Sequence, residues 1–156
     1  SPHSQWALLR EAQMQCGEPL VVTCDAGAEN DLHPRDKSIV AIRAADIADA
    51  LLNGREPVYS PQLLSVTLDR LKIQVKFDTY GSKLEFRGDP DGFAVGEKNT
   101  LYRAKAVIIS DDTVELSHPN LKDPEIIYYG WSNFPTGNLY NTEGLPAAPF
   151  RYCLVP

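Results

Sequence analysis

The first fifty-odd residues of the chain show helical periodicity on both sides of one short apolar run. Residues 4–16 place Trp6, Leu9 and Cys16 near one stripe of an amphipathic helix, which Ser4 can cap. Residues 20–25 (LVVTCD) are apolar and β-branched and are bounded by turn residues. Such a run is typical of a buried strand in a parallel sheet.

A second helix is predicted over residues 36–53, with Arg43 on its polar side. Its expected core stripe repeats at helical spacing and consists of Val40, Ala44, Ile47, Ala48 and Leu51. Helix, strand, loop and helix in this order indicate a doubly wound α/β domain. Because one strand cannot make a sheet, the other strands must come from another chain or from residues missing here.

The pattern changes near Arg55, where helical periodicity ends and β-type alternation begins. Hairpin turns are expected at 80–82 and 111–112. The tail, 132–156, is expected to be an ordered but irregular segment, because its aromatic side chains would be costly to expose. The predicted strands are 64–69, 72–79, 83–87, 92–96, 101–110, 113–117 and 125–131.

Composition and charge narrow the function classes. Of the 156 residues, 43% are apolar and 23% are charged, which is close to the globular average and favours about one folded domain. The net charge of −6 disfavours nucleic acid and anionic membrane surfaces as partners. No apolar run approaches the ~20 residues that span a bilayer. Cys16, Cys24 and Cys153 lack zinc-ligand spacing, and the first two are expected to be small buried residues.

The candidate chemistry lies in the loop over 25–34, directly after the predicted strand. In open α/β sheets, ligands bind at the carboxyl ends of strands. His33 can serve there as a general base, and an acidic neighbour such as Asp31 can orient it. On spacing alone, a turn-capping role for Asp25 or Asp31 remains the alternative. None of the serines lies in the strained strand-to-helix turn expected of a nucleophile.

Aromatic residues gather between 128 and 140. Tyr129, Trp131 and Tyr140 are candidates for stacking on a sugar, and Phe134 belongs to the same group. Packing in the core is the alternative role for these rings.

Four segments, at 6–13 (WALLREAQ), 21–27 (VVTCDAG), 31–37 (DLHPRDK) and 128–151 (YYGWSNFPTGNLYNTEGLPAAPFR), also carry a resemblance. Together they resemble the C-terminal part of the sialate O-acetylesterases, which are SGNH-type carbohydrate esterases. The resemblance implies that residues 1–56 are the last segment of a flavodoxin-like α/β hydrolase domain. Residues 57–156 would then be a β-rich, sandwich-like C-terminal region.

The resemblance also implies roles for individual residues. His33 matches the catalytic histidine and Asp31 its acidic partner, with Asp25 as a second candidate. The common SGNH spacing lands on Asn30, whose amide cannot stabilise an imidazolium. The family needs no metal or organic cofactor, acts on acetylated sugars such as sialic acid, and is typically exported, as periplasmic, extracellular or lysosomal enzymes.

The family's serine and oxyanion-hole segments precede the region covered here. The nucleophile is therefore expected on an N-terminal chain or segment, and this chain alone should be a very poor enzyme. Two other functions stay open. One is a non-catalytic carbohydrate-binding or structural β-module over 57–156, and the other is an esterase that acts on acetylated xylan or another polysaccharide.

Overall fold

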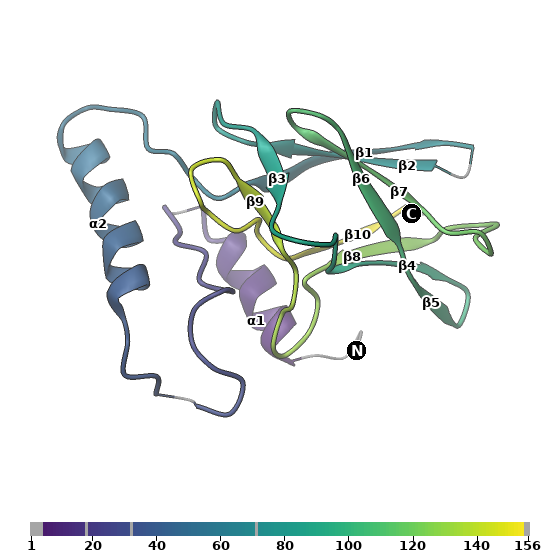
Figure 1. Cartoon of the computed structure of the whole chain (residues 1–156), viewed down its shortest axis with the longest axis horizontal. Helices are drawn as coiled ribbons and strands as arrows, with labels where there is room; N and C mark the ends of the chain where they lie inside the picture. Colours follow the sequence, from purple (N-terminus) through teal and green to yellow (C-terminus); the bar gives the residue numbers. More distant parts are fainter. Residues whose placement is uncertain (1–4, 18, 32, 71, 155–156) are drawn as a thin grey trace.

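The computed structural model describes residues 5–17, 19–31, 33–70 and 72–154 (Figure 1). Ser4, the predicted cap of the first helix, lies outside them. Two helices precede all the strands. The elements are α1 (Gln5–Met14), α2 (Ser38–Leu52), β1 (Gln62–Asp69), β2 (Lys72–Asp78), β3 (Leu84–Phe86), β4 (Phe93–Glu97), β5 (Thr100–Arg103), β6 (Lys105–Ser110), β7 (Thr113–Ser117), β8 (Ile126–Tyr129), β9 (Leu139–Asn141) and β10 (Phe150–Cys153).

Two antiparallel four-stranded sheets form a sandwich, in the orders β1-β2-β7-β6 and β10-β8-β4-β5. The strands alternate buried and more exposed residues, so each sheet turns one face inward. In β2, for example, Ile73, Val75 and Phe77 are buried between partly or fully exposed neighbours. A small third sheet pairs β3 with β9 at one end of the sandwich (Figure 1). The predicted β-rich region is therefore confirmed.

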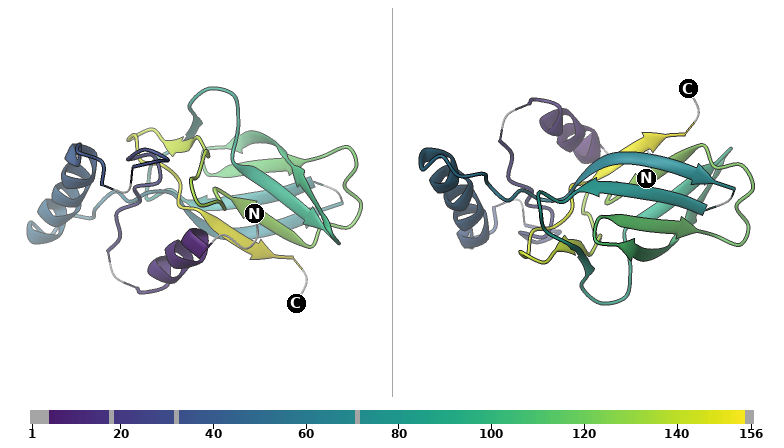
Figure 2. Two further views of the ribbon diagram at one scale, coloured as in Figure 1. Left: turned by 90° about the horizontal axis from the view of Figure 1, so that it is seen from below. Right: turned by 90° about the horizontal axis from the view of Figure 1, so that it is seen from above.

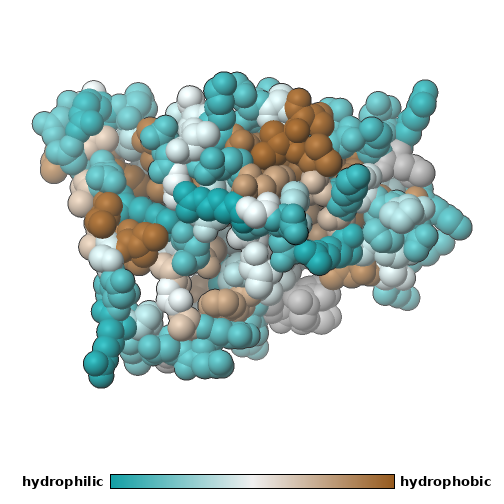
Figure 3. All heavy atoms as spheres, in the orientation of Figure 1, coloured by the Kyte–Doolittle hydropathy of each residue, from teal (hydrophilic) through white to brown (hydrophobic). Residues whose placement is uncertain are grey.

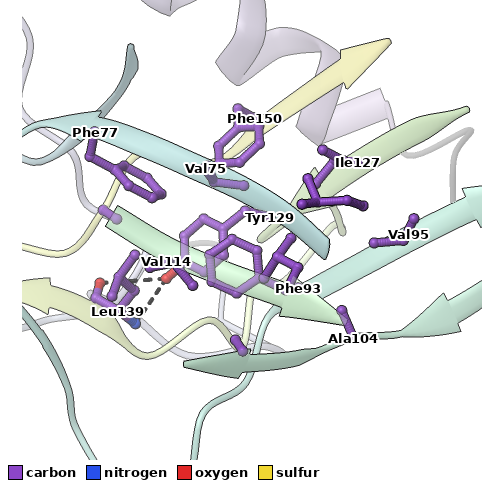
Figure 4. Close-up of a cluster of buried hydrophobic side chains, with 14 of the residues drawn as sticks. Val75, Phe77, Phe93, Val95, Ala104, Val114, Ile127, Tyr129, Leu139 and Phe150 are labelled. Carbon is purple, nitrogen blue, oxygen red and sulfur yellow. Dashed lines mark hydrogen bonds between the residues drawn. The ribbon is translucent and has the colours of Figure 1, made fainter. Parts of the chain in front are cut away.

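The core lies between the two sheets (Figure 4). Phe77 of one sheet contacts Phe150 of the other edge-to-face, with ring centroids 6.0 Å apart. Tyr129 stands at the centre, 4.6 Å from the ring of Phe93, and its hydroxyl accepts a hydrogen bond from the backbone N–H of Leu139 at 3.0 Å. This hydrogen bond ties β9 to the sandwich.

Three details of the β region differ from the sequence prediction. The tail 132–156 is not wholly irregular, because β9 and β10 pair with earlier strands that supply their hydrogen bonds. Residues 101–110 form two strands, β5 and β6, that belong to different sheets. The turn at 80–82 exists, but it joins β2 to β3, which do not pair with each other. Of the two predicted hairpin turns, the one at 111–112 does close a hairpin, between β6 and β7.

Both helices expose the faces that were predicted to be buried. In α1, Ala7 is buried, whereas Trp6 and Leu9 are exposed. In α2, the buried residues are Arg43 and Ala50, and the predicted stripe is partly or fully exposed. Figure 3 shows apolar side chains open to solvent at the α2 side of the molecule, and Figure 2 shows α2 at the far end from the sandwich. The predicted core stripes are therefore wrong for this chain.

The physical reason is the absence of a sheet beneath the helices in the part of the chain that the structure describes. Residues 20–25, predicted to be a parallel strand, form no strand there. All described ladders are antiparallel and belong to residues 62–153. A strand needs a hydrogen-bonding neighbour, and without one the run at 20–25 stays irregular. A flavodoxin-like layer is thus not seen.

The absence of a side chain at Gly92 lets the segment around Gly137 pack closely against the sandwich. Its φ is +98°, and a Cβ there would lie 2.5 Å from the Cα of Gly137 and 2.9 Å from the Tyr129 ring. We expect Gly92→Ala to lower the free energy of unfolding by about 3 kcal/mol, from left-handed strain plus overpacking. Urea denaturation measures this. Gly81→Ala is the control, because Gly81 has a φ of +82° but open space, so only about 1 kcal/mol should be lost. Equal losses would contradict the close contact.

Candidate active site

The loop between α1 and α2 carries Asp31 and His33. Oδ1 of Asp31 accepts a hydrogen bond from the backbone N–H of His33 at 2.9 Å, and the N–H of Asp31 donates to the carbonyl of Ala28 at 3.2 Å. This Asx-type turn fixes the carboxylate beside the histidine backbone. Both residues are exposed. The structure therefore brings the two predicted residues together, and the turn-capping role of Asp31 is real.

The turn does not use the His33 imidazole or the second carboxylate oxygen of Asp31. Among the described residues, none hydrogen-bonds the His33 imidazole or the second carboxylate oxygen of Asp31. An exposed imidazole can accept and return a proton as a general base.

Asp25, the second candidate for the acid role, is bound to Arg43 of α2. Nη1 and Nη2 of Arg43 donate to its two carboxylate oxygens, each at 2.7 Å, and Nη1 also donates to the Val22 carbonyl at 3.0 Å. The Tyr140 hydroxyl donates to Oδ2 of Asp25 at 3.3 Å. Burial alone would raise the pKa of Asp25, but the hydrogen bonds and charge of Arg43 outweigh burial and lower that pKa. The occupied carboxylate favours Asp31 over Asp25 as the partner of His33.

The described serine hydroxyls make no hydrogen bond to the His33 imidazole. None of their hydroxyls hydrogen-bonds an imidazole in the part of the chain that the structure describes. Several are held by other groups: Ser38 by Asp36, Ser82 by Thr142, Ser110 by Asp112 and Ser132 by the carbonyl of Phe134. Ser60 is buried.

The three aromatic residues proposed for sugar stacking are packed inside. Tyr129 is 2% exposed, Trp131 7% and Tyr140 8%. Arg87 covers the Tyr140 ring at 3.9 Å, and Arg151 lies 5.2 Å from the Trp131 ring. Their burial argues against stacking on a ligand and favours the alternative role in packing.

An open hollow of about 630 Å³ lies beside Asp31. Its walls come from α1, the loop over 23–31 and the segment 133–135, and the two aromatic residues among them are Trp6 and Phe134. Trp6 is 52% exposed and Phe134 39%. Sequence reasoning named Phe134 only as one of a group and assigned Trp6 to a helix core. No local signal could have paired them, because they come from opposite ends of the chain.

The cysteines and His118 are the other reactive side chains that the structure describes. All three cysteines are free, and Cys16 is exposed, contrary to the sequence prediction. His118 stacks on Tyr102 at 4.5 Å and accepts a hydrogen bond from the Asn120 backbone. No group of three potential metal ligands gathers within the described ranges. Neither of the described helices is long and apolar enough to cross a membrane.

No protein-family model and no curated protein sequence matches the chain. A solved structure does match. It is the crystal structure of a carbohydrate acetylesterase from Xanthomonas citri, with 34% sequence identity and a TM-score of 0.90. The match covers 99% of this chain and 38% of that chain. The chain is similar to part of a carbohydrate acetylesterase. This finding agrees with the carbohydrate-esterase component of the resemblance, and it carries no information on sialic acid.

Proposed function

We propose that this chain supplies the catalytic histidine, His33, and its acidic partner, Asp31, to a serine esterase that removes O-acetyl groups from carbohydrates. The proposed sugar is sialic acid or a related one. The observation that carries the proposal is the similarity to a carbohydrate acetylesterase, at a TM-score of 0.90 over 99% of the chain. The Asp31–His33 turn supports it, because it holds the Asp31 carboxylate on the backbone N–H of His33, and both residues are exposed.

In the proposed reaction, a serine hydroxyl attacks the acetyl carbonyl and gives its proton to His33. Asp31 orients the imidazole and stabilises its protonated form. Oxyanion-hole donors stabilise the tetrahedral intermediate. The sugar oxygen then leaves with the proton from His33, and water, activated in turn by His33, releases acetate from the acetyl-serine.

The nucleophile and the oxyanion hole would lie on an N-terminal chain or segment outside these 156 residues. Two observations support this part of the proposal. None of the described serines is bonded to an imidazole, and the solved acetylesterase is a longer chain, of which this chain matches 38%. The exposed apolar residues Leu8 and Leu9 of α1 and Ile42, Leu51 and Leu52 of α2 offer a surface that such a segment would cover. Export to the periplasm, the exterior or a lysosome also remains part of the proposal.

Labelling with a fluorescent serine-reactive phosphonate tests the function. We expect the natively purified protein to be labelled on a serine outside these residues, and to release acetate from O-acetylated sialic acid. Release of acetate only from acetylated xylan would support an esterase that acts on a polysaccharide rather than on sialic acid. Label on a serine within this 17.3 kDa chain would overturn the divided site. Saturable sugar binding with neither label nor acetate release would indicate a binding module instead.

A further inference from the structure

Two exposed aromatic side chains face the hollow beside Asp31. Exposed rings that line a concave surface are unusual, because water contact with so much apolar area is unfavourable. Trp6 comes from the start of α1, and Phe134 comes from the segment between β8 and β9. The fold therefore brings together two rings that are far apart in the sequence, in a hollow that Asp31 also lines.

Hydrogen bonds hold the two walls of the hollow to each other. The guanidinium of Arg10 donates to the carbonyl of Ser132, and the Ser132 hydroxyl donates to the carbonyl of Phe134 at 2.6 Å. Arg10 lies four residues after Trp6, so both side chains project from the same face of α1. The backbone that carries Phe134 is thereby held to the helix that carries Trp6.

Polar side chains complete the lining at the catalytic end. Asn30 and Asp31 line the hollow on the loop, and Asn133 lines it next to Phe134. Ligand sites typically combine aromatic walls with a few polar groups in volumes of ~300–1,000 Å³. The apolar C–H face of a pyranose ring can pack against an aromatic ring, while its hydroxyls bond amides and carboxylates.

We propose that Trp6 and Phe134 form a platform for a pyranose ring of the acetylated carbohydrate. The sugar ring lies against one or both aromatic faces, and its acetyl group points toward Asp31 and His33. This inference rests on the proposed esterase function and adds the residues that select a sugar over a simple ester. It also moves the stacking role from the buried Tyr129, Trp131 and Tyr140 to two exposed rings.

Kinetics on two substrates test the platform in the complete protein. For Trp6→Ala and Phe134→Ala, kcat/KM on the acetylated sugar should fall about tenfold or more, mainly through KM. On p-nitrophenyl acetate, which has no sugar, kcat/KM should stay within about twofold. Trp6→Phe and Phe134→Tyr should restore most of the sugar activity. Tyr152→Ala is the matched control, because Tyr152 is also exposed but does not line the hollow.

Three outcomes overturn the platform. The first is an equal loss of kcat/KM on both substrates, as expected if Trp6 and Phe134 support folding or contact another segment. The second is no loss on either substrate. The third is no rescue by the aromatic replacements. If the wild-type protein releases no acetate, the proposed esterase function is wrong. The platform is then tested by measuring the binding of the deacetylated sugar by calorimetry. Binding that both alanine variants abolish would then support it, and unchanged or undetectable binding would overturn it.

Discussion

Replacing His33 by alanine is expected to lower kcat for acetate release by about a thousandfold or more in the complete protein. Without the imidazole, no group takes the proton of the attacking serine or returns one to the sugar oxygen. The substrate contacts remain, so KM should change little. Steady-state acetate release, measured with coupled detection, gives both constants.

The control for this variant is His118→Ala, because His118 stacks on Tyr102 and contacts the Asn120 backbone rather than the loop over 25–34. Its kcat should match that of the wild type. Asp31→Asn separates the two candidate acids, since an amide keeps the turn but cannot stabilise imidazolium. A large fall in kcat is expected for Asp31→Asn. Turnover near the wild-type rate in His33→Ala would end the assignment of His33 as the base.

Replacing Arg43 by alanine is expected to release α2 from the loop that carries His33. Arg43 and Ala50 are the buried side chains of α2, and Arg43 makes a bidentate bond to Asp25, whose side chain is 14% exposed. Removing one partner leaves a largely buried carboxylate uncompensated, which costs about 3 kcal/mol. Amide hydrogen exchange should show protection across Ser38–Leu52 falling about a hundredfold.

Arg55→Ala is the matched control, because the pair that Arg55 makes with Asp49, at the C-terminal end of α2, is exposed on both sides. Exposed pairs contribute little, so protection should change by less than about fivefold. Arg43→Lys should retain only part of the protection, because an ammonium cannot make the bidentate contact. A similar loss in the Arg43 and Arg55 variants would contradict a special role for the buried pair.

The Arg43–Asp25 pair also makes the hydrogen-exchange protection of α2 depend on pH. Arg43 holds the pKa of Asp25 below its usual value, so the folded segment binds this proton less readily than the unfolded one. The contribution of Asp25 is complete above the unfolded value of about 3.9, and it is lost as the pH falls through the lower folded value. The protection of α2 should fall in that acidic window, and Asp25→Asn should remove this dependence.

Local patterns predicted most of the β region and the extent of both helices. The helix predicted over 36–53 is α2 at Ser38–Leu52, and the alternation at 72–79 is β2 at Lys72–Asp78. These signals are reliable because alternation and helical spacing reflect the chain's own geometry. β9 and β10 gave a weaker signal, since short strands depend on partners supplied by β3 and β8.

The sequence by itself determined where both helices and most of the strands form, apart from the run at 20–25 and the late strands β9 and β10. It also singled out Asp31 and His33, which the turn hydrogen bond joins. Only the tertiary structure decided which faces are covered. It left the apolar faces of the helices open and buried Arg43 against Asp25. It also placed Trp6 and Phe134 around one hollow while packing Tyr129 in the core. Spacing along a chain fixes the direction of a side chain relative to its own element. Burial depends on which distant element arrives on that side.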